Sequence, residues 1–281
     1  MGKRGNLARV VESNIELIIV PLVMRVLLAA FIVILVAKLV VKLGPSMGGL
    51  IAGLPVGLGP GFYFLMQEAD KSFLFDSALF SLVALSATQF FLLAYLVSAK
   101  FFKPLNCSLI SIGVWGGCAG CIYQIDFTLV QASFLFTFST LMARYAGGFF
   151  SCNVGVEKKS ENDLVLFLRA LSGGVIVSVV TVFASKIGAQ LSGVLLAFPI
   201  AYVLISFNIH KVFGKATVTE VVYSAVFGTV SLAVFCIAFA LFVKIFTLTY
   251  VLLVSLLGSV LTTALMLVVE SQIQKHRLFL K

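Results

Sequence analysis

Long apolar segments separated by short polar ones follow one another from residue 16 to residue 269. A helix crosses a bilayer with about 20 predominantly apolar residues, and nine segments meet this requirement. The predicted spans are 16–41, 46–67, 73–99, 105–125, 127–151, 164–186, 190–209, 217–243 and 246–269. The longest polar connection, VEKKSEND, separates the fifth span from the sixth. The pattern therefore predicts an all-α polytopic membrane protein without a soluble domain.

The composition supports a membrane protein, since 61% of the 281 residues are hydrophobic and only 11% are charged. A soluble domain carries about 25% charged residues. The basic N-terminus precedes an apolar stretch that is too long for a signal-peptide core, so we expect it to be retained. The net charge of +9 comes from Lys and Arg scattered among the loops, which predicts contact with membrane lipids and not with nucleic acid.

The chain contains an internal repeat with an offset of 144 residues. Of the six charged residues in 169–269, five fall on a charge of the same sign when the chain is shifted by this offset. These pairs are Arg25 with Arg169, Lys42 with Lys186, Lys71 with Lys215, Asp76 with Glu220 and Lys100 with Lys244. Gly49 likewise falls on Gly193, and Pro55 falls on Pro199. Spans 1–4 and spans 6–9 are therefore interpreted as two copies of one unit.

The repeat predicts an N-terminal unit (1–125), a linker of one transmembrane helix and a polar loop (126–163), and a C-terminal unit (164–281). If every span crosses, the fifth span makes the second unit start from the opposite face, which gives an inverted 4+1+4 arrangement. Re-entrant second and seventh spans would instead make the units parallel. Full crossing is favoured because it places the Arg25 and Asp76 ends of the first and third spans on one face. The orientation of the N-terminus stays open.

The second and seventh spans carry helix-breaking residues in corresponding places. The first reads LGPSMGGLIAGLPVGLGPG from residue 43 and the second IGAQLSGVLLAFPIAYVLIS from residue 187. Backbone groups freed by a proline are tolerated in a membrane only against protein or a water-filled cavity. Small residues also serve close helix packing, which is the alternative interpretation. Interrupted spans in both halves nevertheless indicate a transporter binding site. The predicted substrate-binding residues are Pro55, Gly57, Gly59, Tyr63, Pro199, Tyr202, Asn208, Arg25 and Arg169.

Several charged residues allow two roles. Arg25 and Arg169 can bind an anionic group or pair with Asp76 and Glu220. The two carboxylates can form these ion pairs or couple proton movement. Arg144 in the fifth span can face a cavity or lie near an interface.

The remaining polar residues of the spans favour structural roles. Gln89, Gln131 and Asn208 are more typical of interhelical hydrogen bonds than of ligand contacts. The pair Cys118 and Cys121 forms a C-x-x-C sequence, which is redox-active in some proteins but here favours small-residue packing. No catalytic or nucleotide-binding motif is present. We therefore predict no enzymatic activity, no cofactor and no metal site.

The run from Leu164 to Glu270, with LSGVLLAFPIAYVLIS opening its second span, resembles the GlpM-like family of small four-helix bacterial inner-membrane proteins. The similarity rests on Gly193, Phe198 and Pro199 and on the helix spacing, and the first unit departs from it with Leu54 in place of the Phe. The resemblance implies a four-helix unit, duplicated here, and a multi-pass protein of the bacterial inner membrane.

These observations predict a secondary transporter or lipid translocator for a small anionic or zwitterionic solute or lipid headgroup, in which the two units rock against each other. One alternative is a non-transporting membrane subunit that assists envelope lipid or polysaccharide assembly. Another is a membrane thiol oxidoreductase that uses Cys118 and Cys121. A homodimer is compatible with each of them.

Overall fold

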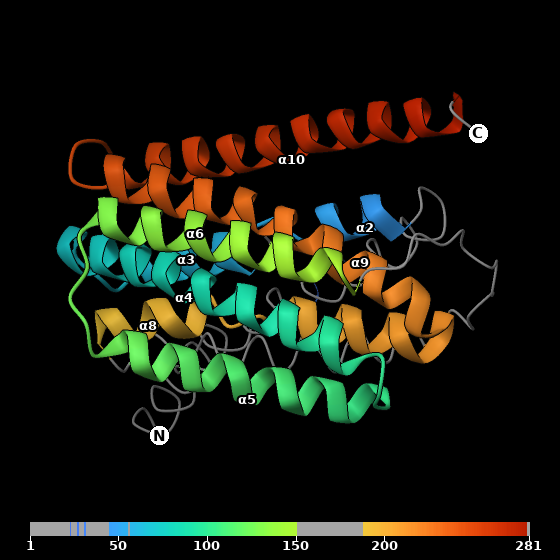
Figure 1. The fold of residues 1–281 in the computed structure, drawn as a ribbon. Helices are drawn as coiled ribbons and strands as arrows, with labels where there is room; N and C mark the ends of the chain where they lie inside the picture. The colour runs from blue at the N-terminus through green and yellow to red at the C-terminus, as the bar shows by residue number, and fades with distance from the viewer. Residues whose placement is uncertain are drawn as a thin grey trace, which may run out of the picture.

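A computed structural model of the chain describes residues 23, 27, 31, 45–55, 57–150 and 188–279, the side chains of 273–279 excepted. Regular secondary structure in these residues is entirely α-helical, and they contain no strand. The helices are α2 (Pro45–Ile51), α3 (Leu58–Leu65), α4 (Lys71–Ser98), α5 (Pro104–Tyr123), α6 (Leu129–Gly148), α8 (Ala189–Leu196), α9 (Ile200–Phe242) and α10 (Leu248–Phe279). Figure 1 shows a bundle of roughly aligned helices with α10 on one side and α5 on the opposite side.

Four helical stretches of the described chain are long and apolar enough to cross a membrane. They are α4, α5, α8 together with α9, and α10 up to Gln272. The prediction of an all-helical, multi-pass membrane protein is confirmed at this level. α4 and α5 agree within two residues with the predicted spans 73–99 and 105–125.

Three further spans can be compared with the predicted limits. α6 is helical inside the predicted range 127–151 but is not among the four apolar stretches. α10 begins near the predicted residue 246 and continues ten residues beyond the predicted end at 269. The predicted spans 16–41 and 164–186 lie outside the described residues, apart from 23, 27 and 31.

The predicted second span, 46–67, is two short helices and not one kinked helix. α2 ends at Ile51 and α3 begins at Leu58, with a segment we call the first break between them (52–57). Gly53, Pro55 and Gly57 fall inside the first break. A proline removes one backbone donor and glycine disfavours the helix, so the local sequence explains the interruption.

The predicted seventh span is also interrupted, but its continuation is longer than predicted. α8 ends at Leu196 and α9 begins at Ile200, which leaves a second break (197–199) that contains Pro199. The predicted gap between spans seven and eight, 210–216, is helical except at Gly214, whose φ of 84° and ψ of −177° turn the chain. A single glycine can adopt this backbone conformation at little steric cost, so no longer loop is required. Gly214 divides α9 into a first part (200–213) and a second part (215–242).

α4 and the second part of α9 pack together in the middle of the bundle and run antiparallel (Figure 1). The Lys71 ammonium at the start of α4 donates to the Phe246 carbonyl after α9, at 2.9 Å. Lys215 at the start of the second part of α9 donates to the Lys100 carbonyl after α4, also at 2.9 Å. A lysine is favourable at a helix C-terminus, where backbone carbonyls lack helical partners. The two contacts close opposite ends of the central pair in the same way.

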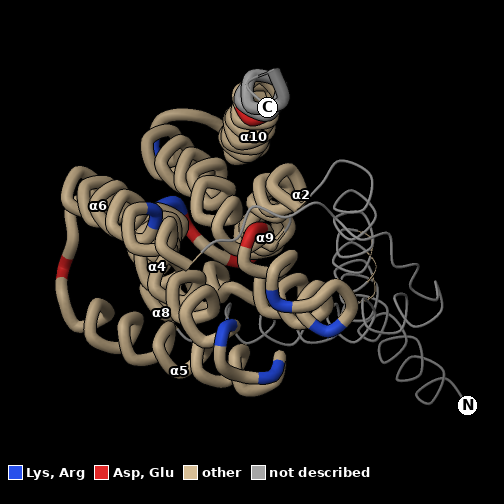
Figure 2. The backbone as a smooth tube through the Cα atoms, turned by 45° about the vertical axis from the view of Figure 1, so that its right-hand side comes forward, with Lys and Arg blue, Asp and Glu red and all other residues tan. Residues whose placement is uncertain are grey.

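The other described helices surround this pair. α5 packs on α4, α10 packs on α9, and α6 packs on both. The outer faces of these three helices are apolar and exposed, as at Phe134 and Tyr145 of α6, each 77% exposed. Figure 2 shows long stretches of α5 and α10 without a charged residue. Such faces suit contact with lipid, and the packed interior lies on their other side.

Candidate functional site

The two broken segments each pack on the long central helix that belongs to the other half of the repeat. Gly49 of α2 lies against α9, so close that a Cβ atom at this position would overlap the Val221 carbonyl oxygen. Gly193 of α8 lies against α4, where a Cβ atom would overlap the Ser77 carbonyl oxygen. Gly49 and Gly193 are 144 residues apart, and so are Ser77 and Val221. The same close contact is therefore formed twice, in reciprocal directions.

Hydrogen bonds accompany both contacts. On the α4 side, Ser77 Oγ donates to the Ala189 carbonyl at 3.0 Å, and Ser81 Oγ donates to the Gly193 carbonyl at 2.9 Å. On the α9 side, the hydroxyls of Ser46 and Ser224 lie 3.0 Å apart. Glycine thus permits close backbone approach, and small hydroxyl side chains of the same turns fasten the helices.

The first broken segment follows the second part of α9 for most of its length. The contacts begin with Ser46 and Ser224 and continue to the ring of Phe62, whose centroid lies 4.5 Å from that of Phe239. The fifteen residues from Ser224 to Phe239 correspond to about 22 Å of helix. The segment does not fold back along this distance.

The second broken segment follows α4 in the same manner. Its contacts run from Ala189 on Ser77 to the His210 ring, whose Nδ1 lies 3.4 Å from the Tyr95 hydroxyl. The eighteen residues from Ser77 to Tyr95 span about 27 Å. The two broken segments also meet, because Gly61 of α3 lies against the Leu196 side chain at the end of α8.

The first break is closed by a side chain from α9. Leu54 N–H donates to the Ile51 carbonyl at 3.0 Å, and Gly59 N–H donates to the Pro55 carbonyl at 2.8 Å. The Gly53 carbonyl, which the interruption frees from the helix, accepts a hydrogen bond of 2.5 Å from Ser231 Oγ. The freed backbone group is thus satisfied by protein.

At the second break, fewer of the freed backbone groups have a hydrogen-bond partner. Phe198 N–H donates to the Leu195 carbonyl at 3.1 Å, and Val203 N–H donates to the Pro199 carbonyl at 2.9 Å. Among the described residues, no group donates to the carbonyl of Ala197, a residue only 5% exposed. The position 144 residues before Ser231 is Ala87, which has no hydroxyl to offer.

The predicted substrate-binding residues are distributed unevenly around the breaks. Pro55, Gly59, Pro199, Tyr202 and Asn208 are buried, and Gly57 is half-buried. Tyr63 is 48% exposed, and its ring contacts that of Phe64. Arg25 and Arg169 lie outside the described residues.

Sequence analysis did not single out Trp115 of α5 as a site residue. Its ring centroid lies 4.9 Å from that of Phe198 in an edge-to-face arrangement, so it borders the second break. A lone tryptophan in a glycine-rich span was the signal that could have identified it. Five buried polar side-chain atoms of the described chain have no hydrogen-bond partner: Ser86 Oγ, Gln89 Oε1, Trp115 Nε1, Tyr202 OH and Ser259 Oγ.

Gln89 joins three helices near the middle of the central pair. Its Nε2 donates to the hydroxyls of Thr140 on α6 and Thr229 on α9, at 2.8 and 2.6 Å. The interhelical role predicted for Gln89 is therefore confirmed. The same prediction for Gln131 is wrong, because its side chain forms a capping box with Thr128 at the start of α6. A residue at a helix N-terminus can satisfy the free backbone N–H groups there and need not reach another helix.

Two charged residues of the described spans, Arg144 and Asp76, contact groups outside the breaks. Arg144 donates to the Tyr223 carbonyl at 2.9 Å, and its guanidinium lies 3.6 Å from the Tyr223 ring centroid and 4.4 Å from that of Phe227. Arg144 thus lies between α6 and α9, in contact with two aromatic rings of α9. Asp76 is near Lys244, whose ammonium lies 4.0 Å from the Phe75 ring centroid. The arginine partners predicted for Asp76 and Glu220 lie outside the described residues.

The cysteine pair of α5 is not joined by a disulfide. Cys118 is half-buried and Cys121 is exposed, and both are free thiols. In the part of the chain that the structure describes, no three His, Cys, Asp or Glu side chains gather as metal ligands would.

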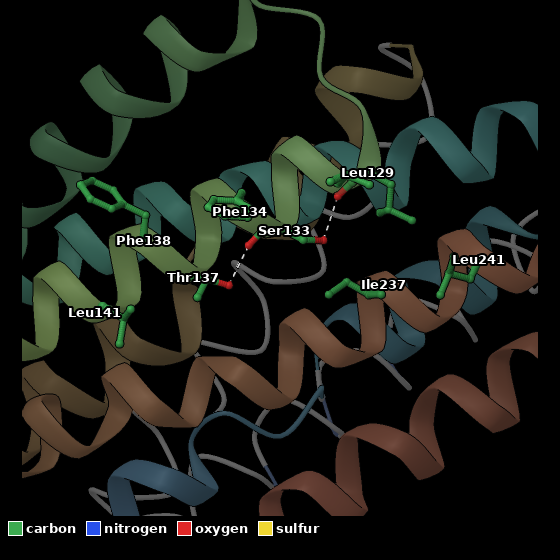
Figure 3. A pocket seen from close by; sticks show the side chains of 9 residues that line it. Leu129, Ser133, Phe134, Thr137, Phe138, Leu141, Ile237 and Leu241 are labelled. Atoms are coloured by element: carbon green, nitrogen blue, oxygen red, sulfur yellow. Dashed lines mark hydrogen bonds between the residues drawn. The ribbon is translucent and has the colours of Figure 1, made fainter.

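A groove on the outside of the bundle adds a second feature of functional interest. It lies between α6 and α9, has a volume of about 430 Å³ and is lined largely by apolar side chains (Figure 3). The hydroxyls of Ser133 and Thr137 donate to carbonyls of α6 itself, those of Leu129 and Ser133, so they do not make the groove polar. The lining of the groove is therefore apolar.

No protein-family model, curated protein or solved structure matches this chain.

Proposed function

We propose that this protein is a secondary transporter or lipid translocator, in which two inverted four-helix units alternate access to a site between their broken spans. The observation that carries the proposal is the reciprocal packing of each broken segment on the long helix of the other half. In this proposal the two units rock against each other as rigid bodies, and the close glycine contacts are the surfaces between them. Interrupted helices at a repeat interface are the usual location of substrate sites in transporters.

Support for inversion comes from the central pair. α4 and the second part of α9 correspond under the 144-residue offset and run antiparallel, with Lys71 and Lys215 at opposite ends. Equivalent helices that are antiparallel require a two-fold axis perpendicular to them, which for membrane spans lies in the membrane plane. The long course of both broken segments beside these helices favours full crossing over re-entrant loops.

The proposed substrate is a small anionic or zwitterionic solute or lipid headgroup, on the basis of the net positive charge and of Arg25 and Arg169. The outer groove between α6 and α9 would accommodate an acyl chain if the substrate is a lipid. We propose the bacterial inner membrane as the location, in line with the resemblance to GlpM-like proteins.

Transport is tested by solute and fluorescent-lipid flux in proteoliposomes. Pro55→Ala and Pro199→Ala restore a helix-forming residue at each break, and we expect both to slow flux at least tenfold. Pro104→Ala is the matched control, because Pro104 begins α5 away from both breaks. Flux that is equal in all three variants would argue against the site. A folded protein that moves no solute or lipid would favour the non-transporting subunit.

Inversion is tested separately by cysteine labelling in a cysteine-free background. Gln67→Cys and Lys211→Cys are suitable because the two residues are exposed and correspond under the offset. Inverted units predict that a membrane-impermeant maleimide labels them from opposite sides of the bilayer. Labelling of both from the same side would contradict inversion.

A further inference from the structure

We propose that the second break binds an uncharged hydrogen-bonding group of the substrate, a hydroxyl or an amide, whereas the first break is closed by the protein itself. This inference rests on the proposed transport function and adds the chemistry that the site recognises. It depends on three polar groups around Pro199 that the described protein leaves without partners.

The first group is the indole N–H of Trp115. This side chain is 7% exposed, and its Nε1 has no hydrogen-bond acceptor. Its edge-to-face contact with Phe198 holds the ring beside the residue that precedes Pro199. Indole nitrogen is a donor only, so a ligand at this point must supply an acceptor.

The second group is the hydroxyl of Tyr202, in the first turn of α9 after the break. The side chain is 4% exposed, and its oxygen has no partner. The corresponding residue of the first half is Leu58, which has no polar atom to satisfy. Since a phenol occupies this position in the second half and a leucine occupies it in the first, the need for a polar partner belongs to the second break.

The third group is the carbonyl of Ala197, an acceptor. Its counterpart Gly53 receives the Ser231 hydroxyl, whereas the residue of α4 that corresponds to this serine is Ala87, which has no hydroxyl. Buried polar groups are almost always hydrogen-bonded in native proteins, so unpartnered ones call for an explanation such as a ligand. A hydroxyl or an amide carries both a donor and an acceptor, which are the two kinds of partner that these groups require.

The described helices around the second break favour an uncharged group. Among them, residues 77–99, 104–125 and 189–209 contain no Lys, Arg, Asp or Glu. An ion taken from water into such a region would lose its hydration without gaining a counter-charge. A charged part of the substrate would therefore have to be bound elsewhere.

The chain contains one tryptophan, so intrinsic fluorescence reports on the second break alone. The purified protein is titrated in lipid nanodiscs with glycerol, glucose and acetamide as uncharged probes, and with phosphate and acetate as anionic ones. We expect a saturable change in Trp115 emission with at least one uncharged probe and none with the anions. A response to the anions alone, or to no probe, would overturn the inference.

Two variants locate the response. Tyr202→Phe removes only the hydroxyl, and we expect it to weaken binding about fivefold to tenfold. Tyr250→Phe makes the same change at an exposed tyrosine of α10 and should leave binding unchanged. Ala87→Ser supplies the missing hydroxyl to Ala197 and should weaken binding, provided that thermal melting shows a folded protein. Equal affinity in all three variants would contradict the proposed site.

Flux measurements on the same variants separate this inference from the proposed function. Transport that persists unchanged in Tyr202→Phe and Ala87→Ser, without any fluorescence response, would leave the transporter standing and overturn the uncharged-group site. A fluorescence response without flux of any solute would support the binding site and count against transport.

Discussion

The two breaks occupy corresponding stretches of the chain, yet they treat their freed backbone groups differently. In the first break, Gly53 lies against the Gly228 backbone, and Ser231 completes its carbonyl. At the second break, the residues that correspond to Gly53, Gly228 and Ser231 are Ala197, Ala84 and Ala87. Alanine allows neither the same close backbone approach nor the hydroxyl hydrogen bond. The comparison indicates that the first break is tightly packed with its backbone carbonyl hydrogen-bonded, whereas the second break retains polar groups without hydrogen-bond partners.

The largest effect is expected from filling the reciprocal glycine contacts. Gly49→Ala and Gly193→Ala each place a Cβ atom against a backbone carbonyl, which cannot move aside as a flexible side chain can. We expect each variant to lower the free energy of unfolding by about 3 kcal/mol, measured by thermal melting in detergent. Gly57→Ala is the control, because a Cβ there meets no described atom within 4 Å. Stabilities within error of the control would refute the reciprocal packing.

A smaller and opposite pair of effects is expected from exchanging the serine between the breaks. Ser231→Ala leaves the Gly53 carbonyl unsatisfied and should reduce stability by about 1–2 kcal/mol. Ala87→Ser adds a donor near the Ala197 carbonyl and should raise stability by about 1 kcal/mol. If both substitutions changed stability in the same direction, the two breaks would not differ in the hydrogen bonding of their freed carbonyls.

Gln89 lies between the two halves, and we expect its substitution to change the free energy of unfolding less than the substitutions above. Gln89→Leu removes two hydrogen bonds but also removes an unpartnered oxygen from a side chain that is fully buried. The Thr140 and Thr229 hydroxyls keep their own bonds to the carbonyls of Phe136 and Val226. We expect a change in unfolding free energy of about 1 kcal/mol or less. A loss several times larger in the same melting assay would indicate that Gln89 Oε1 does accept a hydrogen bond in the folded protein.

The smallest effects are expected at the ends of the central pair. Lys71→Ala and Lys215→Ala each remove one exposed hydrogen bond to a helix-terminal carbonyl. Both should cost about 0.5 kcal/mol, and increasing salt should reduce the cost. Because the two contacts are related by the repeat, clearly unequal costs would show that the two ends are not equivalent.

Part of the fold could be predicted from residue patterns. α4 and α5 lie within two residues of their predicted spans, because long apolar runs bounded by charged residues set helix limits in lipid. The positions of both breaks also followed from Pro55 and Pro199. The continuous helix beyond residue 209 was not predicted, since Lys211 and Gly214 resemble a loop and only the backbone geometry at Gly214 distinguishes a tight turn from one.

The candidate site was predicted only in part. Prolines and glycines in corresponding places indicated where the backbone would be interrupted. The unpartnered indole of Trp115 and the role of Ser231 were not predicted, because neither residue belongs to a broken span. The sequence showed no reason to prefer one serine in an apolar helix over its neighbours.

By itself, the sequence determined the limits of α4 and α5, the charge pattern that repeats after 144 residues and the two places where a helix cannot continue. These properties depend on residues that are adjacent in the chain, since a proline or glycine acts on its own backbone and a span depends on its own apolar length. Only the tertiary structure decided which freed carbonyl is satisfied, because Ser231 reaches Gly53 across 178 residues of chain. The polar character of the second break is therefore a consequence of packing between the two halves.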